Sequence, residues 1–241
     1  ASDAQEDVIA GELHDLLTDA VRIRLRADVP VGAYLSGGLD SSIVAALART
    51  LVPSRLRTFS VTFATPEFDE SAHQQEMAAE LGTKHQSICC TAADIGAMFP
   101  EVIRHVERPI LRTAPAPLFK LSGLVRRAGL KVVLTGEGAD EVLGGYDLFK
   151  EGKIRQFWAR RPDSRWRPLL LKRLYPYLDI SRQGVVYLRQ FFGRGLEQHD
   201  APWFAHIPRW STTSLCKEFF APDLAAQLRH RDPLAELEAA L

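Results

Sequence analysis

The strongest constraint on the fold is a glycine- and serine-rich turn between an apolar strand and a helix. Residues 31–35 form an apolar run, the string SGGLDSS follows at 36–42, and the helix-forming run IVAALA occupies 43–48. A strand that opens into a helix N-terminus in this way presents backbone N–H groups and the positive end of the helix dipole to one point. The segment therefore predicts a phosphate-binding loop.

The carboxylate within this loop indicates a metal ion. Asp40 would repel a phosphate unless a cation lay between them, so the string predicts a Mg²⁺ ion that bridges Asp40 and the polyphosphate of a nucleotide. The glycines permit close backbone approach and the serines add hydroxyl donors. These remaining phosphate-binding candidates are Ser36, Gly37, Gly38, Ser41 and Ser42. An ordinary glycine-rich turn that caps a helix is the simpler alternative.

This loop differs from two other phosphate-binding loops. It lacks the Gly-Lys-Ser/Thr ending of a Walker loop and the Gly-x-Gly-x-x-Gly pattern of dinucleotide-binding folds. It resembles the PP-loop of the N-type ATP pyrophosphatases, which cleave ATP between the α and β phosphates. The resemblance implies ATP as the nucleotide, with AMP and pyrophosphate as products.

A second, acidic string follows the apolar run at 131–135. Residues 136–141 read GEGADE, and three carboxylates so close together repel one another unless they meet a metal, a base or a cationic substrate. An acidic turn at a helix N-terminus is the simpler explanation. Because the string follows a strand beside the phosphate loop, we predict Asp140 as the second metal ligand and Glu137 as the group that orients a nucleophile or handles protons.

Strand and helix patterns alternate through the first 150 residues. An amphipathic helix at 7–26 is expected to pack on the sheet, and a proline-rich loop is expected at 109–117. The remaining patterns predict strands at 31–35, 58–63, 85–90 and 131–135 and helices at 43–48, 69–81, 92–105 and 118–128. This alternation predicts an α/β fold with a doubly wound parallel sheet, flanking helices and ligands at the carboxyl ends of the strands.

The pattern changes after about residue 150, where seven prolines interrupt helical, aromatic and arginine-rich pieces. We therefore predict a nucleotide-binding core at 1–150 and a helical subdomain at 151–241. Residues 153–173 contain eight basic residues and one acidic residue, Asp163. A solvated helical face or a domain contact is the simpler interpretation of this basic stretch, and an RNA contact is the alternative.

Composition excludes several classes of protein. Lys plus Arg and Asp plus Glu each number 30, so no net charge favours nucleic acid or a membrane as a partner, and no apolar run approaches the length of a membrane span. Three cysteines, Cys89, Cys90 and Cys216, provide neither a disulfide framework nor metal-ligand spacing. With no secretory signal, they predict reduced thiols in the cytoplasm.

Four strings in order resemble the synthetase domain of the glutamine-dependent asparagine synthetases. They are SGGLDSS at 36–42, FDES at 68–71, LGTKH at 81–85 and VVLTGEGADEVLGGY at 132–146. In that family a carboxylate, usually the aspartate side chain, attacks the α-phosphorus of ATP to give an acyl-adenylate. Ammonia made from glutamine in a separate glutaminase domain then displaces AMP. The resemblance covers about residues 28–150.

The resemblance also implies roles for individual residues. The serines and glycines of the phosphate loop hold pyrophosphate, and Asp40 and Asp140 share Mg²⁺ with it. Val61 and Gly136 flank the adenine or ribose, and Glu137 lies beside the acyl-adenylate during attack by ammonia. Arg112 matches the arginine that contacts the acid substrate, within a proline-rich segment that departs from the family pattern.

Other departures concern the rest of the enzyme. The chain has no N-terminal catalytic cysteine and no room for a glutaminase domain before Asp28, and neither the family's Arg-x-Pro-Phe-Leu-Asp string nor its downstream lysine precedes Leu241. We expect a fragment whose ammonia comes from another polypeptide or a removed segment. A tRNA-modifying PP-loop enzyme and a nucleotide-binding fragment without complete activity remain alternatives, and a homodimer is one possible assembly.

Overall fold

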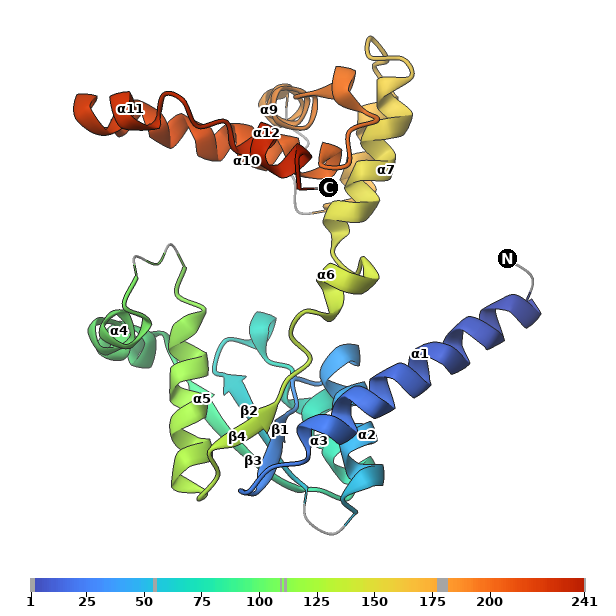
Figure 1. Ribbon diagram of the computed structural model, residues 1–241, viewed down its shortest axis with the longest axis vertical. Helices are drawn as coiled ribbons and strands as arrows, with labels where there is room; N and C mark the ends of the chain where they lie inside the picture. The colour runs from blue at the N-terminus through green and yellow to red at the C-terminus, as the bar shows by residue number, and fades with distance from the viewer. Residues whose placement is uncertain (1–2, 54–55, 109, 111, 177–181, 241) are drawn as a thin grey trace. The chain divides into compact units, whose positions relative to one another are not determined.

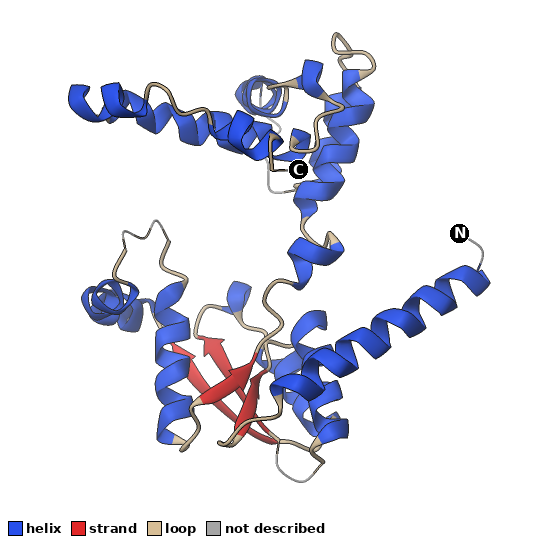
Figure 2. Ribbon diagram, viewed as in Figure 1, coloured by secondary structure: helices blue, strands red, loops and turns tan. Residues whose placement is uncertain are grey.

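The computed structural model describes residues 3–53, 56–108, 110, 112–176 and 182–240. Its N-terminal part is built around one parallel sheet (Figure 1, Figure 2). Within the described residues the strands are β1 (Val31–Tyr34), β2 (Arg57–Phe63), β3 (Lys84–Cys90) and β4 (Val132–Leu134), in the order β3-β2-β1-β4. The predicted α/β fold with a parallel sheet and flanking helices is confirmed.

Alternate residues of β1 face opposite helical layers. Ala33 and the following Leu35 are buried in a core formed with α1 (Asp3–Arg24), α2 (Leu39–Leu51) and α3 (Ser71–Glu80). Tyr34 lies against the second core, which includes Leu121 of α5 (Pro115–Arg127). Because successive side chains of a strand point to opposite faces, this short strand anchors helices on both sides of the sheet (Figure 2).

The first helix packs along only part of its length. Val21 is buried against the core shared with α2, and Leu17 and Leu25 are partly buried there. Towards the N-terminus, Val8 and Leu16 are 61% and 70% exposed. The prediction that the whole apolar stripe packs on the sheet is therefore wrong for the first half of α1, which extends beyond the helix it packs on (Figure 1).

Helix α5 begins inside the stretch that was predicted to be a proline-rich loop. Pro115 is its first residue, and Pro117 is buried in its first turn. Proline lacks a backbone N–H, but no hydrogen bond of the helix is lost there, because the first N–H groups of a helix have no intrahelical acceptor. The preceding helix, α4 (Ala92–Val106), has Glu107 as its C-cap, with a left-handed backbone (φ 57°). Residues 107–114 therefore connect the two helices.

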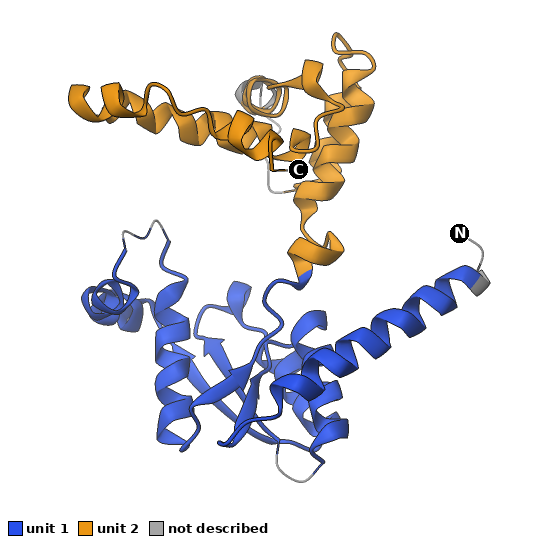
Figure 3. Ribbon diagram, in the orientation of Figure 1, with its two compact units in different colours: residues 1–139 blue, residues 140–241 orange. Residues whose placement is uncertain are grey.

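Contacts divide the chain into two compact units, residues 1–139 and 140–241 (Figure 3). The division falls earlier than the change of sequence pattern near residue 150, and the assignment of the two parts to separate domains stays a prediction. In the described residues of the second unit the structure contains helices and no strand. Among the described helices of the chain, none has both the length and the apolar character needed to cross a bilayer.

The second unit contains both α-helical and 3-10 segments. The longest are α7 (Asp147–Ala159) and α9 (Arg182–Phe192), preceded by the short α6 (Ala139–Leu143). The others are η2 (Arg167–Leu170), α8 (Leu171–Leu174), η3 (Leu196–Gln198), η4 (Phe204–His206), α10 (Ile207–Ser214), η5 (Leu215–Phe219), α11 (Pro222–Leu228) and α12 (Pro233–Glu238). Their core includes Trp158 and Leu171, both buried.

One member of the basic stretch at 153–173 lies in this core. Arg155 is fully buried, and its guanidinium donates hydrogen bonds to the backbone oxygens of Phe192 (2.8 Å), Phe204 (2.7 Å) and Arg194 (2.5 Å). It also lies 4.1 Å from the centre of the Phe204 ring. Burial lowers the pKa of Arg155 to about 10. The stretch is therefore not a uniformly solvated face, and Arg155 is unavailable to RNA.

Candidate nucleotide-binding site

The two predicted motifs follow neighbouring strands. β1 pairs with β4 from Val31 opposite Val132 to Ala33 opposite Leu134, so SGGLDSS and GEGADE leave the same edge of the sheet. β2 lies on the other side of β1. The chain runs outward from β1 through β2 to β3 and then crosses to β4 on the other side of β1. The carboxyl edge between β1 and β4 is therefore the topological switch point, where open parallel sheets bind ligands.

The serine hydroxyls of the first loop bond within the loop itself. Ser41 Oγ accepts a hydrogen bond from Ser36 N (3.0 Å) and lies 2.8 Å from Ser36 Oγ. Ser36 Oγ also accepts from Gly38 N (3.1 Å), and Ser42 Oγ donates to Gly38 O (2.7 Å). Ser41 and Ser42 are buried, whereas Ser36 is exposed. The hydroxyls of Ser41 and Ser42 therefore hold the loop in shape.

Backbone N–H groups make the loop suitable for an anion. Gly38 is the N-cap of α2 and supplies no side-chain cap, so the N–H groups of the first turn, from Leu39 onward, lack intrahelical acceptors. Ser42 N is the first to bond within the helix, to Gly38 O (3.2 Å). Together with the dipole of this 13-residue helix, these donors favour a negative ligand at the edge of the sheet.

Gly136 joins the second motif to the first. A Cβ atom on Gly136 would lie 2.7 Å from Ser41 N and 2.9 Å from the carbonyl carbon of Asp40, which is closer than side chains come to backbone. A residue without a side chain is thus required for the two loops to touch. The backbone of Gly136 sits on the first turn of α2, and the exposed Glu137 is the next residue.

The acidic residues fit a magnesium site in part. The partly buried carboxylate of Asp40 makes no hydrogen bond or ion pair with any other described residue. The described residues contain no cluster of three or more His, Cys, Asp or Glu side chains that could hold a metal. Magnesium bound to a nucleotide needs only one or two carboxylates besides phosphate oxygens, so Asp40 fits. Asp140 belongs to the second unit, and its pairing with Asp40 stays a prediction.

Val61 lies on β2, and its backbone oxygen accepts a hydrogen bond from a side chain of α3. Gln74 Nε2, from α3, donates to Val61 O (3.0 Å). The Gln74 side chain is only 3% exposed, and its Oε1 has no partner among the described residues. Sequence analysis missed Gln74, whose only signal is a glutamine within the helix that follows FDES. The role of Val61 beside the base stays a prediction.

Helix α3 also packs against the phosphate loop. Gly37 has a left-handed backbone (φ 87°), and a Cβ atom on it would lie 2.9 Å from His73 Cβ and 3.1 Å from Gln74 N. Glycine is needed here for both the conformation and the space. Gln74 therefore lies between the phosphate loop and Val61, two elements that were predicted to hold different parts of one nucleotide.

Arg112 lies apart from these contacts. It is exposed in the connection between α4 and α5, and its side chain makes no hydrogen bond or ion pair with the other described residues. The structure thus brings the phosphate loop together with Gly136, while the role of Arg112 stays a prediction.

His85, the last residue of the string LGTKH, lies near the beginning of β3. It pairs in register with Thr58, and its Nδ1 is 3.0 Å from Thr58 Oγ1. Burial lowers the pKa of His85. His85 therefore bonds within the sheet at the amino end of β3, away from the carboxyl edge that carries the phosphate loop.

Comparisons with known proteins agree with the motifs. The family model described as asparagine synthase matches residues 12–238. Asparagine synthetase [glutamine-hydrolyzing] 1 of Bacillus subtilis is 35% identical over 166 residues, which are 69% of this chain and 26% of that protein. A putative asparagine synthetase [glutamine-hydrolyzing] of Mycobacterium bovis is 40% identical over 140 residues, which are 58% of this chain and 21% of that protein.

Similarity to solved structures is weaker. An NH3-dependent NAD synthetase from Campylobacter jejuni aligns over 92% of both chains with 16% sequence identity and a TM-score of 0.39, which carries no functional argument. The chain spans about a quarter of the length of the two curated relatives. Because the family match extends over nearly all of its residues, the chain belongs to the asparagine synthase family.

Proposed function

We propose that this chain carries the ATP-dependent part of an amide-forming reaction of the asparagine-synthetase type. The observation that supports this most strongly is the contact of Gly136 with Asp40 and Ser41, which joins the two sequence motifs at one point of the sheet edge. A nucleotide phosphate at the start of α2 would thereby lie beside both loops. The names of the curated relatives agree with this reaction class.

In the proposed reaction a carboxylate oxygen of the acid, with aspartate as the first candidate, attacks the α-phosphorus of ATP. The bond to the β-phosphate oxygen breaks, and pyrophosphate leaves. Ammonia then attacks the acyl carbon, loses a proton, and expels AMP to form the amide. Such transfer depends on positioning and on neutralising negative charge, so no nucleophile of the protein is needed.

The residues of this chain have distinct parts in that scheme. The N–H groups at the start of α2 bind pyrophosphate, with the loop held rigid by Ser41 and Ser42. Asp40 and Asp140 would hold Mg²⁺, which supplies positive charge to the phosphates when bound. Val61 and Gly136 flank the adenosine, and Arg112 pairs with a carboxylate of the acid. Glu137 accepts the proton that the attacking ammonia releases.

Glutamine is the proposed source of ammonia, through a glutaminase domain or subunit, and the cytoplasm is the proposed location. The basic stretch at 153–173 gives less support to tRNA as a substrate, because Arg155 is buried within the helical unit. The Arg167 guanidinium likewise donates to Phe157 O (2.5 Å) and lies 4.1 Å from the centre of that ring.

Product analysis tests the proposal. The purified protein is incubated with ATP, MgCl₂, aspartate and either ammonium or glutamine together with a glutaminase, and the nucleotide products are separated. We expect aspartate-dependent AMP and pyrophosphate together with asparagine. Formation of ADP and phosphate, or AMP that appears only when tRNA is added, would contradict the proposed reaction.

A further inference from the structure

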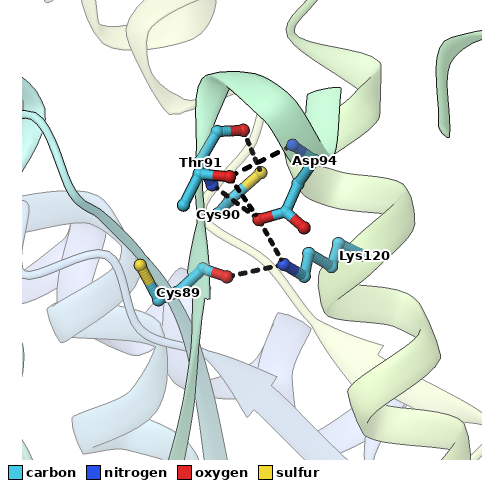
Figure 4. Close-up of polar contacts among 5 residues, drawn as sticks. All are labelled: Cys89, Cys90, Thr91, Asp94 and Lys120. Carbon is cyan, nitrogen blue, oxygen red and sulfur yellow. Dashed lines mark hydrogen bonds and ion pairs between the residues drawn. The ribbon is translucent and has the colours of Figure 1, made fainter. Parts of the chain in front are cut away.

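Lys120, in the second turn of α5, connects three elements of the first unit (Figure 4). Its Nζ donates to the backbone oxygen of Cys89 near the end of β3 (2.8 Å) and lies 2.7 Å from Asp94 Oδ2 in the first turn of α4. The side chains of Lys120 and Asp94 are 21% and 34% exposed. The ammonium group therefore links α5 to the edge strand and to α4.

Asp94 is itself fixed in place by its own helix. Its Oδ2 accepts hydrogen bonds from Thr91 N and Thr91 Oγ1, both at 2.8 Å, and Asp94 N donates to Thr91 Oγ1 (3.1 Å). This reciprocal pair is a capping box that sets the first residue of α4. The carboxylate that Lys120 contacts thus has one defined position (Figure 4).

The neighbouring residue of α5 contacts the other end of α4. The ring of Phe119 lies 4.9 Å from the ring of His105, measured between centres. Two consecutive residues of α5 therefore hold both ends of α4. The connection that carries Arg112 leaves α4 just after His105 and enters α5 at Pro115. Both ends of this connection are thereby fixed relative to the sheet.

We propose that Lys120 is a positioning residue for the acid substrate, because it holds α5 and α4 at the end of β3 and so determines where Arg112 lies. The inference rests on the proposed function, in which Arg112 pairs with a carboxylate of the acid. The proposal predicts that Lys120 affects the binding of the acid and not the binding of ATP. A lysine that merely stabilised the fold would influence ATP and the acid alike.

Three variants test the proposal kinetically. Lys120→Met keeps the apolar stem and removes the charge, and Lys120→Arg keeps the charge. The control, Lys84→Met, removes an exposed lysine at the start of β3, the strand that Lys120 contacts at Cys89. For Lys120→Met we expect the KM for aspartate to rise by roughly tenfold, below the roughly hundredfold that an ångström of misplacement can cause, with the KM for ATP unchanged. Lys120→Arg and Lys84→Met should stay close to wild type. Equal changes in both KM values, or none, would overturn the proposal.

Hydrogen exchange provides a measurement that does not depend on activity. Peptides that span residues 107–114 should exchange faster in Lys120→Met than in wild type, while peptides that span 36–42 should exchange at the same rate. Unchanged exchange at 107–114 would overturn the proposal. If the wild-type protein forms no aspartate-dependent AMP, the proposed function fails, but the exchange measurement still tests whether Lys120 fixes the connection.

Discussion

A Cβ atom on Gly136 would lie only 2.7 Å from the backbone nitrogen of Ser41. These residues belong to motifs that are far apart in the sequence and follow the adjacent strands β1 and β4. Their contact places the backbone of Gly136 on the first turn of α2. The effect of changes at this contact should therefore be visible in nucleotide binding as well as in stability.

Replacement of Gly136 by alanine should separate the two loops. The added methyl group must displace backbone, and overpacking of this kind costs about 1 to 3 kcal/mol. We expect a lower thermal midpoint and weaker binding of Mg-ATP, measured by calorimetry. Gly96→Ala is the control, because no atom beyond its chain neighbours and its own helix backbone lies within 4 Å of the added Cβ, and alanine favours the helix there. Wild-type binding and stability in Gly136→Ala would show that the contact is unimportant.

Asp40→Asn should weaken magnesium-dependent binding of ATP without destabilising the protein. The carboxylate has no partner among the described residues, so its loss removes no contact of the fold. A hydrogen bond to a charged group contributes about 1.5 to 3 kcal/mol, and we expect binding to weaken by an amount in that range. Titration of ATP with and without Mg²⁺ measures it, with the exposed Asp163→Asn as control. Asp140→Asn should act in the same way, and unchanged affinity in both variants would refute the shared metal site.

The pair of Asp94 and Lys120 should stabilise the protein down to acidic pH. The pKa of Asp94 lies far below its ordinary value, chiefly because of its hydrogen bonds with Lys120 and then Thr91. A depressed pKa means that its stabilising effect is fully present above the unfolded pKa of about 4 and is lost as pH falls below it. The difference in thermal midpoint between wild type and Asp94→Asn should be constant from about pH 8 to 5 and shrink in stronger acid. A difference that changes mainly near neutral pH would point to another titrating group.

Arg155→Met should destabilise the helical unit strongly. The change leaves the backbone oxygens of Phe192, Phe204 and Arg194 without this donor, and each unsatisfied buried group costs about 1 to 3 kcal/mol. Arg160→Met, at an exposed position five residues further along, should leave the thermal midpoint nearly unchanged. If both variants melt like wild type, the hydrogen bonds of Arg155 do not support this unit.

The strands could be predicted closely because their signal is local. The apolar runs at 31–35 and 131–135 correspond to β1 and β4 within a residue, and turn residues bound each of them. The position of both motifs at the carboxyl edge followed from the alternation of strands and helices. What the sequence could not supply was the contact of Gly136 with Ser41, because it depends on the side-by-side pairing of two distant strands.

Other features were not predicted, because each side chain was assigned the exposure and contacts that are usual for its residue type. A run of arginines usually marks a solvated face, yet Arg155 finds three backbone acceptors inside the helical unit. The hydroxyl of Ser42, which was predicted to contact phosphate, also bonds to Gly38 O, and the sequence pattern did not predict this bond within the loop. Apolar spacing in α1 indicated burial, yet Leu16 is mostly exposed. Each outcome depends on tertiary neighbours that no local pattern contains.

The pairing of Val31 with Val132 also affects the order in which the protein folds. Two strands separated by on the order of a hundred residues must close a long loop, and such contacts form slowly. A nascent chain that has emerged only through α3 already contains the phosphate loop but lacks its partner from the acidic loop. A ligand that requires both loops binds only after β4 has inserted, and it then stabilises the completed sheet by mass action. Nucleotide binding would thus stabilise only those chains in which β4 has already paired with β1.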